Sequence, residues 1–217
     1  MSPVEVFVRL AAAALAGYLL GSTPSGVLVG RLFGNVDPRM HGSGKTGATN
    51  VLRTLGPGPA LLVVTMDAAK GAIAILLARF VFMPAGPDIS VALQGWAEAC
   101  AGFAALLGHN YSLFLKFTGG RGVATGAGTM LAISPFVFLV AIIAFIVPIA
   151  TTRYVSLGSI LACAAAGITD IVLAVLGLDS PQHAIYIAAG AAFIIWSHHD
   201  NIQRLLSGTE RKFSLSH

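Results

Sequence analysis

Residues 135–150 read Pro-Phe-Val-Phe-Leu-Val-Ala-Ile-Ile-Ala-Phe-Ile-Val-Pro-Ile-Ala, a run without a single charged side chain. A helix needs about 20 mainly apolar residues to cross the hydrocarbon core of a bilayer, and this run supplies most of them. Further apolar segments occupy residues 4–22, 58–83, 89–107, 123–133, 157–177 and 183–197. The pattern predicts an all-α integral membrane protein with seven transmembrane helices.

The composition supports a membrane location. Hydrophobic residues make up 56% of the 217 positions and charged residues only 10%, whereas soluble domains carry about 25% charged residues. No change in composition marks a boundary, so we predict a single membrane domain over residues 1–217. The net charge of +4 comes from basic residues in short patches, not from the basic stripe expected of a nucleic-acid-binding protein. No pattern indicates a particular oligomeric state.

The basic residues divide the connections between these segments into two sets. With seven spans, one set comprises residues 31–55, 108–122, 151–156 and the tail from residue 198. This set contains ten of the thirteen Lys and Arg residues, namely Arg31, Arg39, Lys45, Arg53, Lys116, Arg121, Arg153, Arg204, Arg211 and Lys212. The opposite set contains Asp88 and Asp179 and no basic residue. Because basic connections stay in the cytoplasm, we predict an external N-terminus and a cytoplasmic C-terminus. The short segment 123–133 leaves six spans open, but six spans would break this division.

The first connection of the predicted cytoplasmic set is rich in glycine and in hydrogen-bond donors. It reads His41-Gly-Ser-Gly-Lys-Thr-Gly-Ala-Thr-Asn50, followed by Arg53. Glycines let consecutive backbone N–H groups curl around an anion, and Ser, Thr and Lys add donors and charge. A Walker A loop is excluded because Arg39 stands where that motif requires glycine, and a dinucleotide-binding loop would follow a strand. The residues indicate phosphate binding without either motif.

Three further polar patches lie on the same predicted side. In chain order they are Gly108-His-Asn-Tyr111 with Lys116-Phe-Thr-Gly-Gly-Arg-Gly-Val-Ala-Thr125, then Arg153-Tyr-Val-Ser-Leu-Gly-Ser159, then His198-His-Asp-Asn201 with Arg204. One glycine-rich loop alone is most simply a flexible interfacial turn, but two on one face favour an anion site. The second loop also leads into the start of a helix, where the helix dipole favours phosphate. His198 or His199 is a candidate general base.

Ionisable residues also occur inside the predicted spans, where they are expensive and face a polar interior. Asp67 and Lys70 lie three residues apart on one helical face, which fits a structural ion pair and a substrate contact equally well. For Glu98 and Asp170 we expect hydrogen bonds from helix to helix.

Together these motifs resemble those of the bacterial acyl-phosphate:glycerol-3-phosphate acyltransferases. The resemblance rests on residues 42–53, 108–111, 116–125, 153–157 and 198–202, together with 21–26, Asp67 and 70–71. It covers essentially the whole chain, in order. Departures from the family pattern are Lys45 in place of asparagine, Arg121 in place of lysine, Asp200 in place of glutamate, and Tyr111-Ser112 in place of Phe-Pro.

The resemblance implies a seven-helix enzyme of the bacterial cell (inner) membrane with its active site facing the cytoplasm. It implies transfer of a fatty acyl group from acyl phosphate to the 1-hydroxyl of glycerol 3-phosphate, which gives lysophosphatidic acid. The expected partners are glycerol 3-phosphate, fatty acyl phosphate and membrane lipid. By matching position, the catalytic residues are Ser43, Arg53, His198 and Asn201, and the substrate-binding residues are Gly119, Gly120, Gly122 and Ser156. We add Lys45, Asn50 and Arg121 to the predicted substrate-binding residues because they lie in the same motifs.

The residues themselves argue against a covalent acyl-enzyme. No histidine is followed five residues later by aspartate, and no Gly-x-Ser-x-Gly elbow occurs. An acyl phosphate is already an activated anhydride, so the protein need mainly hold two anions, orient the hydroxyl and stabilise the oxyanion. We therefore predict direct transfer, with His198 or a substrate phosphate oxygen accepting the hydroxyl proton.

Two other aspects of the site follow from the motifs. They contain no carboxylate cluster suited to Mg²⁺, so we predict neither a cofactor nor a metal ligand. The alternative function is membrane transport of a small phosphorylated anion, which multiple spans and intramembrane charge would also suit. The halves of the chain show no evident repeat and the polar patches lie on one side, so the enzyme is favoured.

Overall fold

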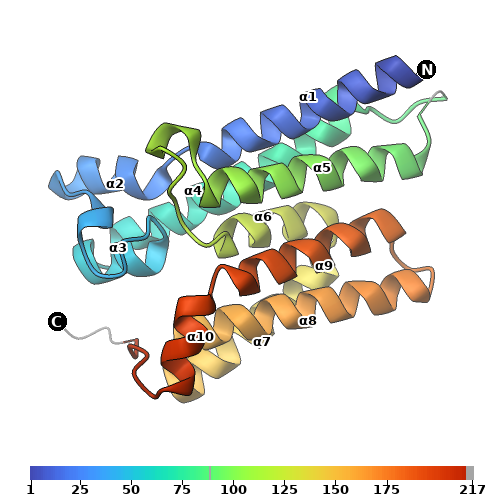
Figure 1. Cartoon of the computed structure of the whole chain (residues 1–217). Coiled ribbons are helices and arrows are strands. Elements are labelled where there is room, and N and C mark those ends of the chain that lie inside the picture. The colour runs from blue at the N-terminus through green and yellow to red at the C-terminus, as the bar shows by residue number, and fades with distance from the viewer. Residues whose placement is uncertain (88, 214–217) are drawn as a thin grey trace. The chain divides into compact units, whose positions relative to one another are not determined.

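The computed structural model describes residues 1–87 and 89–213, and every regular element in that part of the chain is a helix (Figure 1). It forms two compact units, unit 1 (Met1–Ile133) and unit 2 (Ser134–His217). Unit 1 contains α1 (Pro3–Ser22), α2 (Ser25–Gly34), η1 (Pro38–Met40), α3 (Ala48–Leu55), α4 (Pro57–Leu77), η2 (Ala78–Phe82), α5 (Val91–Asn110), η3 (Leu113–Leu115) and α6 (Val123–Ile133). Unit 2 contains α7 (Pro135–Thr152), α8 (Val155–Val175), α9 (Pro181–Trp196) and α10 (His199–Leu206).

All seven predicted apolar segments form helices, so the prediction of an all-α fold is confirmed. Among the described residues, five helical stretches are long and apolar enough to cross a membrane: Pro3–Gly34, Pro57–Phe82, Val91–Asn110, Pro135–Thr152 and Val155–Val175. The other two helices, α6 and α9, have 11 and 16 residues. Asp88, one of the two acids predicted for the external side, lies outside the described residues.

Proline and serine fix where several helices begin. A proline occupies the first turn of α1, α4, α7 and α9, where its missing N–H costs nothing and its fixed φ suits the helix. Three helices begin after a serine whose side chain accepts a backbone N–H bond of 3.2 Å, namely Ser2, Ser90 and Ser180. These serines and prolines are the local signals that separate one apolar segment from the next.

Close packing of small residues brings α1 against α5 in unit 1. A side chain added at Gly17 would strike the backbone of Ala101, and one added at Gly21 would strike the backbone of Ala105. Membrane helices approach closely through small residues because dispersion between their backbones replaces the hydrophobic effect. This packing places the C-terminal ends of α1 and α5 next to each other, where the polar loops of unit 1 begin.

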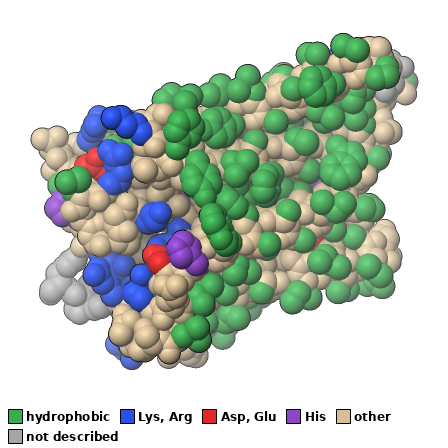
Figure 2. Space-filling view, in the orientation of Figure 1, with side chains coloured by type: hydrophobic (Ala, Val, Ile, Leu, Met, Phe, Trp, Pro, Cys, Tyr) green, Lys and Arg blue, Asp and Glu red, His purple; other side chains and the backbone are tan. Residues whose placement is uncertain are grey.

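Apolar side chains cover the flanks of the long helices, whereas four charged residues within the spans are buried, namely Asp67, Lys70, Glu98 and Asp170. Figure 2 shows hydrophobic side chains spread along these flanks with few charged ones among them. Glu98 is only 2% exposed and bonds to Arg79 at 2.8 and 3.0 Å, so the predicted contact between helices is confirmed for Glu98 as an ion pair. Asp170 is fully buried in α8, and neither of its carboxylate oxygens has a hydrogen-bond partner among the described residues, so the helix-to-helix hydrogen bond predicted for Asp170 is not observed. The pairing of Glu98 with Arg79 suits a hydrocarbon surrounding, in which polar groups must be satisfied internally.

Candidate active site

The first glycine-rich loop of unit 1 is folded around the side chain of Asn50. Its amide nitrogen donates to the backbone carbonyls of Pro38 at 2.6 Å, His41 at 3.0 Å and Lys45 at 2.9 Å. Its amide oxygen accepts a 3.0 Å bond from the backbone N–H of Ser43. Asn50 is therefore the brace that shapes this loop, while substrate contact by Asn50 stays a prediction.

This loop presents donors to its outer side. Gly42 and Gly44 adopt positive φ angles of 58° and 68°, a left-handed conformation that favours glycine. Ser43 between them is exposed, and Lys45 is half-buried. The tight turn leaves the Ser43 hydroxyl at the surface and the Lys45 ammonium group close to it in sequence, while the backbone N–H groups of Ser43 and Gly44 bond inward to Asn50 and to the His41 carbonyl. A hydroxyl and an ammonium group are donors suited to an oxyanion.

Asn50 and Arg53 lie on helix α3, so the prediction of a continuous connection over residues 31–55 is wrong in detail. Helix α2 extends to Gly34 and ends on a left-handed Asn35 with φ of 48°. Helix α3 has only 8 residues and is bounded by Gly47 and Gly56. Arg53 is exposed in its last turn. A helix this short depends on tertiary contacts for its stability.

The second loop of unit 1 follows α5. The predicted loop residues 108–110 instead form the last turn of α5, since the helix continues until Tyr111. Beyond it, residues 112–118 close a small loop through bonds from Ser112 N–H to the Thr118 carbonyl at 3.2 Å and from Phe117 N–H to the Ser112 carbonyl at 2.8 Å. Residues 119–122, here called the glycine loop, then lead directly into α6.

The glycine loop combines buried glycines with a basic side chain. Gly119, Gly120 and Gly122 are buried, and Arg121 between them is half-buried. Gly122 has a φ of 85° immediately before α6 begins at Val123. Backbone N–H groups at a helix N-terminus favour an anion, so the predicted phosphate-binding character of this segment fits its geometry.

Both loops of unit 1 are attached to the junction between α1 and α2. Ser112 donates its hydroxyl to the carbonyl of Ser22 at 2.5 Å, which fixes the start of the second loop. Gly26 lies against the backbone carbonyl of Thr46, where a side chain would collide, which fixes the first loop. Residues 21–26, part of the resemblance noted above, thus hold two loops that are far apart in sequence on one short segment.

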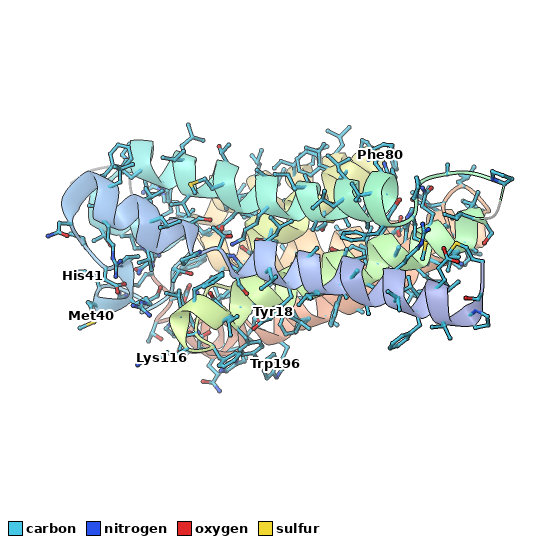
Figure 3. All side chains as sticks on the ribbon, turned by 90° about the horizontal axis from the view of Figure 1, so that it is seen from above. Tyr18, Met40, His41, Phe80, Lys116 and Trp196 are labelled. Carbon is cyan, nitrogen blue, oxygen red and sulfur yellow. The ribbon has the colours of Figure 1, made fainter. Side chains whose placement is uncertain are left out.

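The polar end of unit 1 is opposite the end that carries Phe80. Figure 3 shows His41 and Lys116 near the end formed by the two loops, with Phe80 near the other end of α4. The predicted ion pair between Asp67 and Lys70 forms at 2.8 Å, with both side chains less than 10% exposed. Its burial favours the structural role over direct substrate contact.

In unit 2, three candidate donors converge on the carboxylate of Glu210. One carboxylate oxygen accepts from the Ser156 hydroxyl and from the Asn201 amide, both at 2.8 Å. The other accepts from the Arg204 guanidinium at 2.7 Å. Burial by itself raises the pKa of Glu210, but these three hydrogen bonds outweigh it and hold the pKa below its usual range. Ser156 and Asn201, predicted from separate motifs, are thus brought together.

Ser156 and Asn201 are also helical residues. Ser156 lies in the first turn of α8 and Asn201 lies on α10, so the predicted connection 151–156 ends earlier than expected. Glu210 was missed by the sequence analysis. The available signal was a lone acid in a basic tail that also contains Arg211 and Lys212.

His198 has the geometry of a general base. It is 4% exposed, directly precedes α10, and its Nδ1 lies 2.8 Å from the carbonyl of Ile194. A carbonyl can only accept, so Nδ1 carries a proton, and in the neutral form of the ring the lone pair is on Nε2. His199, the other candidate, is exposed and bonds to the Trp196 carbonyl at 3.0 Å. Buried His198, three residues before Asn201, is the better candidate.

The structure therefore groups the predicted residues into three sets. Unit 1 carries Ser43, Lys45, Asn50 and Arg53 in and beside the first loop, and Gly119, Gly120, Arg121 and Gly122 in the glycine loop, while unit 2 carries Ser156, His198 and Asn201. Within the described ranges, no group of three or more His, Cys, Asp or Glu side chains is arranged to hold a metal ion.

Comparison with known proteins places these residues in a family. Residues 11–208 match the family model for glycerol-3-phosphate acyltransferase. The chain belongs to the glycerol-3-phosphate acyltransferase family. That match includes most of both units and every predicted site residue, and it confirms the resemblance noted from the motifs.

Named relatives and solved structures agree with this membership. The glycerol-3-phosphate acyltransferase of Synechococcus sp. (strain JA-3-3Ab) is 44% identical over 198 residues, or 91% of this chain and 90% of that protein. That of a Thermus thermophilus strain is 44% identical over 199 residues, or 91% and 92%. The crystal structure of PlsY (YgiH), an integral membrane glycerol 3-phosphate acyltransferase, matches in its glycerol 3-phosphate form with a TM-score of 0.80 and 36% identity, over 94% of this chain and 96% of that one. Its lysophosphatidic acid form matches with a TM-score of 0.79 and 35% identity, over 95% and 96%.

Proposed function

We propose that this membrane acyltransferase moves a fatty acyl group from acyl phosphate to the 1-hydroxyl of glycerol 3-phosphate, forming lysophosphatidic acid and phosphate in phospholipid biosynthesis. The observation that carries the proposal is the family match over residues 11–208, which includes every phosphate-type motif. The related PlsY structures were obtained in glycerol 3-phosphate and lysophosphatidic acid forms, which supports this acceptor and this product.

The chemistry is a direct transfer. The 1-hydroxyl oxygen attacks the carbonyl carbon of the acyl phosphate, an ester bond forms, and the bond between that carbon and the phosphate oxygen breaks. The hydroxyl proton passes to Nε2 of His198 or to a phosphate oxygen of a substrate, and phosphate leaves. The leaving group is already good, so the protein contributes by binding, orientation and charge stabilisation.

Each unit contributes a defined set of groups to this proposal. In unit 1, Ser43 and Arg53 bind phosphate oxygens, and the glycine loop binds the phosphate of glycerol 3-phosphate through its backbone N–H groups. In unit 2, Ser156 would donate to an anionic substrate oxygen by turning its hydroxyl away from Glu210, which accepts that hydrogen in the structure. Asn201 follows His198, the base candidate, by three residues. The geometry of His198, with Nδ1 bonded to a carbonyl at 2.8 Å, supports proton acceptance at its other nitrogen.

The proposed membrane arrangement has seven spans, an external N-terminus and a cytoplasmic C-terminus, in a bacterial cell membrane. Helices α6 and α9 would complete the seven, and α6 packs closely on α4, where Gly128 lies against the backbone of Ala68. The division of the basic residues supports cytoplasmic loops, which is where water-soluble glycerol 3-phosphate is expected.

The deciding experiment is acyl transfer by the purified protein in lipid. Radiolabelled glycerol 3-phosphate is supplied with either palmitoyl phosphate or palmitoyl-CoA, and labelled lysophosphatidic acid is measured. We expect product from the acyl phosphate alone. Product only from the thioester would replace the proposed donor, and no product from either donor with folded protein would overturn the proposed reaction.

A further inference from the structure

The glycine loop lies directly on the side chain of His109. A side chain added at Gly120 would collide with the His109 ring near Nε2, Cε1 and Cδ2. The backbone N–H of Gly120 also donates to the His109 carbonyl at 3.0 Å. Gly119 is equally confined, because an added side chain would strike the carbonyl oxygens of His109 and Asn110. The imidazole ring of His109 therefore packs directly against the glycine loop.

The ring lies beside a buried ion pair. Nδ1 of His109 lies 3.5 Å from Oδ1 of Asp67, and Lys70 pairs with the same aspartate oxygen at 2.8 Å. Lys70 in turn donates to the backbone carbonyl of Thr23 at 3.0 Å. The exposed fractions of Asp67, Lys70 and His109 are 2%, 6% and 6%. The ring is thereby connected through α4 to the end of α1.

Stability alone explains this arrangement poorly. Burying charged groups carries a desolvation cost that apolar side chains of similar size would avoid. What these buried contacts add is orientation. Nδ1 lies near Asp67 without a hydrogen bond to it, and the opposite edge of the ring faces Gly120. Supporting groups of this kind keep a binding site in its productive geometry.

We propose that His109, oriented by Asp67, is a positioning residue. By packing against Gly120 it fixes the position of the glycine loop, and hence the affinity of the loop for the phosphate of glycerol 3-phosphate. The inference rests on the proposed function, in which the glycine loop binds that phosphate. It adds a buried group that does not touch substrate and acts only through the loop.

The first test is His109→Asn in the acyl-transfer assay. The asparagine amide nitrogen replaces Nδ1 and keeps the contact with Asp67, but the ring atoms that pack against Gly120 are lost. We expect KM for glycerol 3-phosphate to rise about tenfold, with kcat and KM for palmitoyl phosphate within about twofold of wild type. A general loss of structure would instead lower the amount of active protein and leave KM for glycerol 3-phosphate unchanged.

Glu98→Gln is the matched control. It breaks a buried ion pair within the same two helical stretches, Pro57–Phe82 and Val91–Asn110, away from the glycine loop. We expect it to lower thermal stability while leaving KM for glycerol 3-phosphate unchanged. An equal rise in KM in this control would overturn the inference, because the effect would then belong to any weakening of the helix pair.

A size-complementation test covers the case in which His109→Asn does not fold. Gly120→Ala places a methyl group against the ring and should raise KM for glycerol 3-phosphate about tenfold. Adding His109→Ala removes the ring and should return KM part of the way to wild type. Additive damage in the double variant would refute the positioning role. An inactive wild-type protein would instead refute the proposed function, so the two failures are distinguishable.

Discussion

Replacing Arg53 with alanine is expected to lower kcat/KM for glycerol 3-phosphate by about a hundredfold. Arg53 is exposed in the last turn of α3, close in sequence to the loop that presents Ser43. A hydrogen bond to a charged group contributes about 1.5–3 kcal/mol, and about 1.4 kcal/mol corresponds to a tenfold change in rate. Initial rates of the purified variant in lipid, with palmitoyl phosphate as donor, give the measurement.

Two companion variants separate charge from geometry. Arg53→Lys keeps the charge but loses the planar pair of donors, so we expect a smaller fall of about tenfold. Arg31→Ala removes an equally exposed arginine in the last turn of α2 and should stay within about twofold of wild type. Near-normal turnover of Arg53→Ala, or an equal loss in Arg31→Ala, would contradict the role assigned to Arg53.

The sequence was sufficient to locate the helices of the seven apolar segments but not the helices between them. Every apolar segment became a helix because a bilayer-spanning stretch has a strong compositional signal. Helices α2 and α3 lack such a signal. Helix α3 has 8 residues with Asn50, Arg53 and Thr54 among them, a composition also typical of a polar loop. Its stability comes from packing against α4 and from the Asn50 brace, which no local pattern reveals.

The candidate site shows the same division. Glycine-rich and basic motifs identified the loops, since anion binding needs those residue types whatever the tertiary structure around them. The roles of His109 and Glu210 depend on contacts between distant positions. Ser156 and Glu210 are separated by 54 residues, and His109 meets Asp67 only because α4 packs on α5. Such pairs become visible only in the folded structure.

Replacing Glu210 with glutamine should destabilise the protein and lower its activity together. The Glu210 side chain is 6% exposed and accepts from Ser156, Asn201 and Arg204. An amide cannot accept on both sides, so some of these donors lose their partner, at a cost of about 2 kcal/mol. The apparent midpoint of thermal unfolding should fall by about 5 °C, and kcat/KM about tenfold, because Ser156 and Asn201 are no longer held together. An unchanged midpoint would contradict this role.

The pH dependence of the difference in stability between the wild type and Glu210→Gln provides an independent check. The hydrogen bonds hold the pKa of Glu210 below its usual range, so the ionised carboxylate stabilises the fold above the unfolded-state pKa. That contribution is lost as pH falls through the lower, folded-state pKa. The wild type should therefore exceed Glu210→Gln in stability by a constant amount from about pH 8 to pH 6, and the gap should close on acidification below about pH 4.5. Glu5→Gln, which removes an exposed pair with Arg9 whose side chains are 45% and 36% exposed, should cost less than about 0.5 kcal/mol at any pH. A gap that stays constant down to about pH 3 would show that the carboxylate charge is not what holds these groups together.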